Sequence, residues 1–554
     1  MVSRWLTRKL RRDLWAHRWP FLAVGVIIAI GIAVYIGASD AYANLQQSFD
    51  RAYAVQRLPD VVVAGPEAGS LADKVRALPG APLVTVRQQA DVGLRIGGHA
   101  LVGRVVTVPD GGQPEVSQLA LRTGGLPHAG EVVVEQHVAD HSGLAAGDPV
   151  ELLTTTGWRS WRVSGSALST EYFWPAPSRQ EILSTPEHFG VVFAVPSDLS
   201  SLQATPLEQL LVYATDRGQA EAVVSATDEL AGPGMAVTVR DDQPSYRALQ
   251  DDVTSVGEFA TVLPWIFLVA AVFGTYVLLS RLVAAQRAVI GTMSANGLPA
   301  SRIRTHYVAY GLVAAALGIP PGLVGGYLIG GWFTTSYTDA LGLPLHVVTL
   351  HPLNLAVGAA VGLLSALVAA WAPARSAGRV TPAEAMRVGP PGGSGKRSLS
   401  ERLLPALRGL PARWRMALRG LARNRRRSVM TVTGVAVAVM LVMVFAGLAD
   451  TVASVVDRQF SVIQAEDAQL VTVPGAAAAV ASRLSADPDV RAAEVFARAP
   501  ATIERAGRVE DSLLVAFQPD TTMHRFVADG HTLTLPADGV LLGIGARRLL
   551  AVRE

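Results

Sequence analysis

The stretches Leu10–Val26, LRRDLWAHRWPFLAVGV, and Ala417–Thr433, ALRGLARNRRRSVMTVT, follow one pattern. Each begins with arginines and leucines at helical spacing and then enters an uncharged apolar run. Each apolar run is followed by an aspartate, Asp40 in the first copy and Asp450 in the second, and then by a polar segment. A repeated unit of basic helix, apolar run and polar domain favours a transporter or a membrane scaffold.

Five apolar runs are long enough to cross a hydrocarbon layer of ~30 Å. They are Phe21–Ala38, Val262–Val283, Tyr307–Phe333, Leu353–Ala372 and Val429–Leu448. None contains Asp, Glu or Lys, whose side chains are costly inside a membrane. Hydrophobic residues make up 50% of the 554 positions. The sequence therefore predicts a membrane protein: an α-helical transmembrane bundle of five spans with α+β extracytoplasmic domains.

Charge between the spans predicts their orientation. Residues 1–20 hold six Lys or Arg and one acid, and residues 373–427 hold fourteen and two. Residues 39–261 instead hold fourteen Lys or Arg against twenty-seven acids. Basic segments stay in the cytoplasm, so we expect a multi-pass plasma-membrane protein with a cytoplasmic N-terminus.

Two other interpretations of the basic segments are less favoured. A nucleic-acid surface is disfavoured because every arginine cluster borders a span. A cleaved signal peptide would find an A-x-A site at Ala41–Ala43, but the first apolar run is longer than a typical signal core. We therefore expect the first span to remain as an anchor.

Domain boundaries follow the ends of the apolar runs. We expect a cytoplasmic basic amphipathic helix (1–20), a first span (21–38), an extracytoplasmic α+β domain with helical stalks (39–261), a three-span domain (262–388) with a cytoplasmic loop (284–306), a cytoplasmic linker and basic helix (389–428), a fifth span (429–448) and the start of a second extracytoplasmic domain (449–554). Because the second copy lacks the three later spans, we expect a fragment or a truncated product.

The segment 39–261 has the pattern of an α+β domain, with short β-branched runs between Gly, Pro and Asp. The expected strands are Asp60–Ala64, Leu83–Val86, Val92–Ile96, Leu101–Val108, Glu131–Val134, Pro149–Leu153, Trp161–Val163, Gly190–Val195, Gln209–Tyr213 and Met235–Val239. Helices are expected at Ala68–Leu78, Arg217–Leu230 and Ser245–Ala260, and the first span should continue outward as a stalk. In the second copy we expect strands at Gln469–Val473, Ala501–Glu504 and Ser512–Ala516.

The run Arg287–Arg304, RAVIGTMSANGLPASRIR, joins the second and third spans. Such a short basic loop can fix topology only, or it can seat in a groove of a cytoplasmic partner. It resembles the segment R-x-x-I-G-x-x-x-A-x-G of the FtsX-like and MacB-like permeases of ATP-binding-cassette (ABC) systems, which a basic residue soon follows. The matching residues are Arg287, Ile290, Gly291, Ala295, Gly297 and Arg302. Asn296 stands where leucine is commonest in the family.

A second run, Trp371–Arg387, resembles the family pattern P-A-R-x-A-x-x-x-x-P-x-E-A-L-R that closes the fourth span. The matching residues are Pro373, Ala374, Arg375, Ala377, Pro382, Glu384, Ala385 and Arg387, with Met386 in place of leucine. The resemblance implies that residues 262–388 are an FtsX-like permease domain and residues 39–261 a MacB-like periplasmic core domain. It also implies that the 284–306 loop is a coupling helix for an ABC ATPase.

The residues predict no catalytic centre, cofactor or metal in this chain. The run Pro390–Arg397, PPGGSGKR, is nearest to a phosphate-binding loop, but Pro390 replaces the first glycine and Arg397 replaces the Ser or Thr. The ATPase must then be a separate polypeptide. His137 and His141 could form one face of a zinc site, but a solvated helix face is favoured because no third ligand group is evident.

Small residues recur at four-residue spacing in two spans, where they allow helices to approach closely. They are Gly322, Gly326 and Gly330 in the third span and Gly358 and Gly362 in the fourth. Static packing and an interface that shifts during a transport cycle both fit this pattern.

The functional hypothesis is an ABC permease subunit that couples ATP hydrolysis by another chain to movement of an extracytoplasmic domain. The expected partners are a cytoplasmic ABC ATPase in two copies, membrane lipid, and a lipid, lipoprotein or peptide substrate. An extracytoplasmic partner protein also fits, and nucleic acid does not. The alternatives are a non-transporting regulator of a cell-wall hydrolase or sensor kinase, and a structural scaffold.

Overall fold

The computed structural model describes residues 2–177, 185–232, 234–343, 345–381, 411 and 425–547, with gaps at 471, 473–474, 506–507, 529–530, 537, 544 and 546. The chain forms two compact units. The helical unit comprises Met1–Ala52 and Gln250–Phe445, and the sheet unit comprises Tyr53–Leu249 and Ala446–Glu554. Helices α2, α7 and α14 each belong to both units, because the division falls within them.

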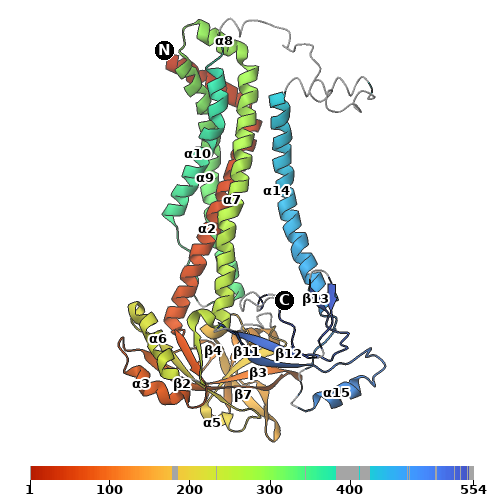
Figure 1. The fold of residues 1–554 in the computed structure, drawn as a ribbon. Helices are drawn as coiled ribbons and strands as arrows, with labels where there is room; N and C mark the ends of the chain where they lie inside the picture. Colours follow the sequence, from red (N-terminus) through yellow and green to blue (C-terminus); the bar gives the residue numbers. More distant parts are fainter. Residues whose placement is uncertain are drawn as a thin grey trace. The chain divides into compact units, whose positions relative to one another are not determined.

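The helical unit is built from helices, most of them long and apolar (Figure 1). They are α1 (Val2–Ala16), α2 (Arg18–Gln56), α7 (Pro244–Ala285), α8 (Arg287–Ala295), α9 (Ala300–Ala340), α10 (Pro352–Ala377) and α14 (Arg425–Asp457). Among the described residues, α2, α7, α9 and α10 are long and apolar enough to cross a membrane. The first four predicted spans lie within these four helices. The fifth predicted span lies in α14, which is not one of the four, so the count of five stays a prediction.

The core of the helical unit consists of apolar side chains from α2, α7, α8, α9 and α10. Its largest fully buried members include Phe21, Ile28, Ile32, Ile36, Tyr307 and Tyr310. Helix α9 continues through Pro320 and Pro321 without a break, so these prolines do not interrupt the predicted third span.

The sheet unit contains a ten-stranded sheet in the order β10-β1-β9-β2-β3-β8-β5-β7-β4, with β6 paired to β2 and β7. The strands are β1 (Val61–Ala64), β2 (Leu83–Ile96), β3 (His99–Thr107), β4 (Ala120–Gly124), β5 (Glu131–Glu135), β6 (Pro149–Thr154), β7 (Gly157–Leu168), β8 (Phe189–Ala194), β9 (Leu207–Tyr213) and β10 (Ala236–Val239). Helices α3 (Ala72–Arg76), α4 (Gln136–Ser142), α5 (Pro196–Leu199) and α6 (Ala220–Ala231) accompany them. This arrangement confirms an α+β domain.

Two strand predictions differ from this sheet. The runs Leu83–Val86 and Val92–Ile96 are one strand, β2, because the polar residues between them stay in the ladder with β9 and β3. Strand β4 was not predicted, since its sequence ALRTG has four exposed positions and no apolar alternation. The predicted stalk is present, because α2 extends to Gln56 and its residues Leu45, Phe49 and Tyr53 are buried.

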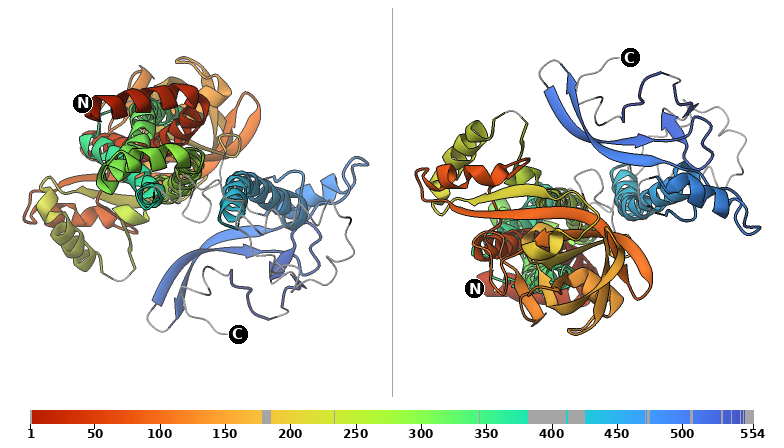
Figure 2. Two further views of the ribbon diagram at one scale, coloured as in Figure 1. Left: turned by 90° about the horizontal axis from the view of Figure 1, so that it is seen from above. Right: turned by 90° about the horizontal axis from the view of Figure 1, so that it is seen from below.

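The second polar segment contains fewer regular elements. They are α15 (Ala477–Leu484), β11 (Ala497–Arg505), β12 (Arg508–Ala516), β13 (Phe526–Ala528) and β14 (His531–Leu533). Strands β11 and β12 pair as a hairpin that includes both later strand predictions (Figure 2). The predicted strand Gln469–Val473 is wrong for its described residues, because Gln469, Leu470 and Thr472 lie outside any strand.

Candidate functional site

Helix α8 is the short helix that follows α7 and precedes α9. Gln286 is its N-cap residue, and the chain leaves it through Gly297 at φ +83°, a conformation that favours glycine. The Leu298 N–H donates to the Met293 carbonyl over 3.1 Å, which closes the helix end as in a Schellman motif. The first predicted motif therefore comprises α8, the turn at Gly297 that ends it and the first turn of α9.

The six residues of that motif divide into two groups. Ile290 is fully buried in the apolar core of the helical unit together with Met293, and Gly291 is buried beside it. The exposed members are Arg287, Ala295, Gly297 and Arg302. The buried pair holds α8 on the unit, while the exposed four lie on α8 (Arg287 and Ala295), in the turn after it (Gly297) and in the first turn of α9 (Arg302).

A polar network ties α8 to α1 and α9. The Gln286 amide nitrogen donates to Asp13 over 2.8 Å, and its oxygen accepts from Lys9 at 2.7 Å and from the Tyr307 hydroxyl at 2.8 Å. The Tyr310 hydroxyl donates to Asp13 over 2.6 Å, and Lys9 and Asp13 form an ion pair. Gln286, the residue directly before α8, is thus held by Asp13 and Lys9, which lie 273 and 277 positions earlier in the chain. We call this set of five the Asp13 junction.

Asp13 is charged within this junction. Burial raises the pKa of its carboxyl, but hydrogen bonds from Lys9, Tyr310 and Gln286 outweigh burial and hold the pKa below its ordinary value of 3.8. The carboxylate and the Lys9 ammonium therefore compensate each other at neutral pH.

The glycines of α9 seat α2. A β-carbon at Gly326 would lie 2.6 Å from Cβ of Ile36, and one at Gly322 would lie 2.9 Å from Cβ of Ile32. Gly330 meets α2 as well, because a β-carbon there would lie 3.0 Å from the carbonyl oxygen of Gly37. Most larger residues at these positions would overlap α2.

The glycines of α10 meet the same two isoleucines. β-Carbons at Gly358 and Gly362 would lie 3.0 Å from Cδ1 of Ile36 and 2.5 Å from Cδ1 of Ile32. Ile32 and Ile36 are thus held between α9 and α10. The sequence pattern identified the small residues but not α2 as their common partner.

The second motif is described only in part. Pro373 is buried and Arg375 is exposed, both in the last turns of α10. Pro382, Glu384 and Arg387 lie outside the described residues. The described end of α10 packs closely on α9, because a β-carbon at Gly378 would lie 2.7 Å from Cγ of Arg304.

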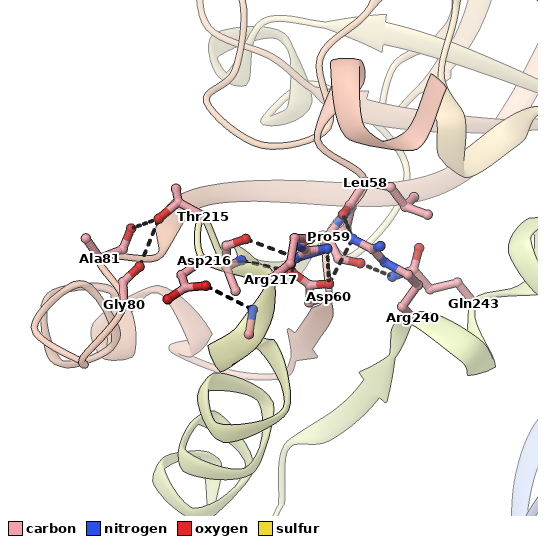
Figure 3. Close-up of polar contacts among 12 residues, drawn as sticks. Leu58, Pro59, Asp60, Gly80, Ala81, Thr215, Asp216, Arg217, Arg240 and Gln243 are labelled. Carbon is pink, nitrogen blue, oxygen red and sulfur yellow. Dashed lines mark hydrogen bonds and ion pairs between the residues drawn. The ribbon is translucent and has the colours of Figure 1, made fainter. Parts of the chain in front are cut away.

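A second carboxylate gathers polar contacts in the sheet unit, at Asp60 (Figure 3). Arg217 and Arg240 both form ion pairs with Asp60, the latter at 2.8 Å. The Ala214 N–H donates to the same carboxylate over 2.8 Å. Only 7% of the Asp60 side chain is exposed, so the arginines and the backbone replace its hydration.

The surroundings of Asp60 join two chain segments that lead from the stalks. Arg240 donates to the Leu58 carbonyl over 2.6 Å, and Gln243 donates to the Pro59 carbonyl over 2.9 Å. Leu58 and Pro59 follow α2 after the single residue Arg57, and Gln243 directly precedes α7. We call Asp60 with Arg217, Arg240 and Gln243 the Asp60 junction. It links the end of one stalk helix to the start of the other.

The part of the chain that contains α8 matches a known protein family. Residues 261–382 match the family described as FtsX-like permease C-terminal, so they include α8, α9, α10 and most of α7. This part of the chain is an FtsX-like permease domain. The match agrees with the resemblance to ABC-type permeases that the sequence motifs indicated.

The comparisons with curated proteins and with solved structures gave no similarity and weak similarity, respectively. A search of curated proteins found no match. Among solved structures, the extracellular domain of the noncanonic ABC-type transporter YknZ from Gram-positive bacteria covers 32% of this chain and 89% of its own, at 10% identity and a TM-score of 0.21. A TM-score of that size supports no conclusion about the fold.

Sequence reasoning missed both junctions of the permease. Asp13 is the only acid among residues 1–20, which was the one available signal that it faces inward. Asp60 was predicted only as the first residue of a strand. The two histidines considered for zinc make carboxylate contacts instead, His137 with Glu135 at 2.7 Å and His141 with Glu187 at 3.8 Å. Among the described residues, no cluster of His, Asp and Glu could hold a metal ion.

Proposed function

We propose that this permease couples ATP hydrolysis by a separate cytoplasmic ATPase to movement of its extracytoplasmic domain. The observation that carries the proposal is the division of α8 into a buried and an exposed face. Ile290 and Gly291 anchor the helix, while Arg287 and Ala295 remain at its surface, next to the exposed Arg302 in the first turn of α9. An anchored helix with exposed arginines suits docking to an acidic groove, since force on it passes to the helices that hold it.

The Asp13 junction supports this proposal because it leaves α8 little freedom to move alone. Gln286 is bonded to α1 through Asp13 and Lys9 and to α9 through Tyr307. A displacement of α8 would break these bonds or carry α1 and α9 with it. Helices α2 and α7 then supply the route to the extracytoplasmic domain, and the Asp60 junction joins their ends.

The partners in this proposal are two copies of the ATPase and an extracytoplasmic substrate of the lipid, lipoprotein or peptide class. Regulation of a cell-wall hydrolase or a sensor kinase through an extracytoplasmic partner is the alternative use of the same motion. Identification of the molecule captured by the extracytoplasmic domain during turnover would separate the two.

Site-specific photocrosslinking tests the docking surface directly. A photoreactive phenylalanine analogue at Ala295, in the full chain in native membranes, should crosslink to a protein that carries ATPase motifs. The same analogue at exposed Asp228 of the sheet unit serves as the control and should give no such product. The proposal fails if Ala295 captures no ATPase or if both positions capture it equally.

A charge reversal tests the role of the arginines. Arg287→Glu should leave the permease inserted but lower retention of the ATPase in a pull-down by about tenfold or more, because an interfacial charge pair becomes a repulsion. Arg76→Glu, at an exposed arginine of the sheet unit, is the matched control and should retain the ATPase. Full retention by Arg287→Glu would reduce the loop to a topology signal.

A further inference from the structure

Helix α1 presents two different faces. Its inner face carries Leu6, Leu10 and Leu14, which pack against the core of the helical unit, and Lys9 and Asp13, which belong to the Asp13 junction. Lys9 and Asp13 are partly buried and bonded to each other and to Gln286. The face is therefore fixed in place by apolar and polar contacts.

Among the described residues, the large exposed side chains of α1 and of the first two residues of α2 are basic or aromatic. Trp5, Arg8, Arg12, Trp15 and Trp19 follow one another at spacings of three and four residues, so they form one stripe along the helix. All five are exposed, with Trp15 at 75% and Trp19 at 72%. We call these five residues the α1 stripe.

Two further arginines border the α1 stripe. Arg11 is exposed, and the Arg18 guanidinium lies 5.4 Å from the ring centroid of Trp15 and 5.7 Å from that of Trp19. The only acid in residues 1–20, Asp13, faces inward. The outer surface of this helix is therefore uniformly positive and aromatic.

We infer that the α1 stripe is a binding surface for anionic phospholipid headgroups. Tryptophan is the side chain that accumulates at the boundary between hydrocarbon and water, and arginine pairs bidentately with phosphate. The stripe directly precedes the apolar run of α2, so a spanning α2 brings it to the membrane surface. The four arginines complement the negative charge of a cytoplasmic leaflet.

The exposed tryptophans favour a lipid over an acidic protein as the ligand of the α1 stripe. Three exposed tryptophans on a water-facing surface would be an apolar liability, whereas at a membrane boundary they are favourable. Each basic side chain near an anionic surface strengthens attraction by about fivefold. Loss of two arginines should therefore remove most of the preference for anionic lipid.

The test uses the full chain, whose lack of cysteine allows one label at a chosen place. A fluorophore on Ala16→Cys, an exposed position beside the stripe, is placed in nanodiscs of phosphatidylcholine. Small amounts of phosphatidylglycerol or phosphatidylcholine are then added, each with a nitroxide on the acyl chain near the headgroup. We expect stronger quenching by the phosphatidylglycerol.

Arginine variants then decide whether the α1 stripe is responsible. Arg8→Gln with Arg12→Gln should bring quenching by the two lipids to within about a factor of two, while Arg8→Lys with Arg12→Lys should retain the preference because the charge is kept. Arg76→Gln with Arg162→Gln, at exposed arginines of the sheet unit, is the control and should change nothing. Equal quenching in the native chain, or a preference that survives the glutamine variant, would overturn the inference. These readouts need no ATPase, so they are independent of the proposed coupling.

Discussion

The Asp13 and Asp60 junctions each use one carboxylate to hold chain segments that are distant in sequence, but they are built differently. Asp13 has one cationic partner and two neutral ones, Tyr310 and Gln286. Asp60 has two guanidinium partners and a backbone N–H. Hydrogen bonds from neutral donors to a charged carboxylate contribute about 1.5–3 kcal/mol each, and removing one partner of a buried ion pair costs about 3–5 kcal/mol. Removing Asp60 leaves two cations without their carboxylate and removing Asp13 leaves one, so we expect the Asp60 junction to contribute the larger free energy.

The largest effect is expected at Asp60. Asp60→Ala leaves Arg240 partly buried without its carboxylate, so we expect a loss of about 3 kcal/mol, which is roughly 6–12 °C for a domain of this size. The value is at the low end because Arg217 is half exposed. Tryptophan fluorescence during heating of the full chain in detergent measures it. Asp73→Ala, at a carboxylate that is 96% exposed, should shift the midpoint by less than about 2 °C. Equal shifts in the two variants would mean that the buried ion pairs of Asp60 contribute no more to stability than the exposed Asp73.

A smaller effect is expected where the helical unit depends on close packing. Gly326→Val places carbon within 2.6 Å of Cβ of Ile36, so we expect a loss of about 1–3 kcal/mol from overpacking against α2. The thermal aggregation midpoint of the full chain in detergent measures this loss. Gly434→Val in α14 is the control, because no atom lies within 4 Å of a β-carbon there. An equal loss in both variants would reflect helix propensity and not the α2 contact.

A double-mutant cycle measures the strength of the Asp13 junction. We expect Lys9→Met and Asp13→Asn each to destabilise the permease and to show a coupling energy of about 1–2 kcal/mol, because each leaves the other without its charge partner. The measurement is the same thermal midpoint, taken for both single variants and the double variant. Additivity to within about 0.5 kcal/mol would mean that the ion pair contributes nothing to stability.

The smallest effect is a pH dependence in the sheet unit. Burial lowers the pKa of His137, but Glu135 and Asp140 outweigh it and raise the pKa above 6.5. The protonated imidazolium therefore stabilises the fold below pH 6.5, and this contribution is lost as pH rises through the raised value.

The matched variants separate this histidine from the Asp13 junction. The midpoint difference between the native chain and His137→Gln should be larger at pH 5.5 than at pH 8.5, by no more than about 1 kcal/mol. The Asp13 carboxyl has a lowered pKa, so it is fully ionised at both pH values. The penalty of Asp13→Asn should therefore be equal at both. A pH-independent His137→Gln penalty would contradict the assignment.

Local pattern predicted most of the elements, because apolar length and β-branched runs are read from neighbouring residues. The four candidate spanning helices, the stalk of α2 and most strands of the large sheet agree with those predictions. Strand β4 was missed because its stability comes from pairing with β7 and not from its own side chains. Whether α8 docks to an ATPase stays a prediction.

The polar junctions could not be predicted, because their members are dispersed along the chain. Gln286 and Asp13 are 273 positions apart, and Arg217 and Asp60 are 157 apart. Nothing in the local sequence distinguishes Gln286 from any other glutamine at the end of a helix. Only the packing of α1 against α9, a tertiary contact, brings the members of the Asp13 junction together.

The two stalk helices differ in one residue that makes them mechanically unequal. Between its first turn and Gln56, α2 contains no proline, so it is a continuous rod of about 50 Å. Helix α7 carries Pro264 in its interior, where the missing N–H leaves one turn without its hydrogen bond. Under the same axial load we therefore expect α7 to bend at that turn before α2 bends. An equal axial displacement of both helices would then tilt the segments at their other ends, because α2 would stay straight while α7 would bend at Pro264.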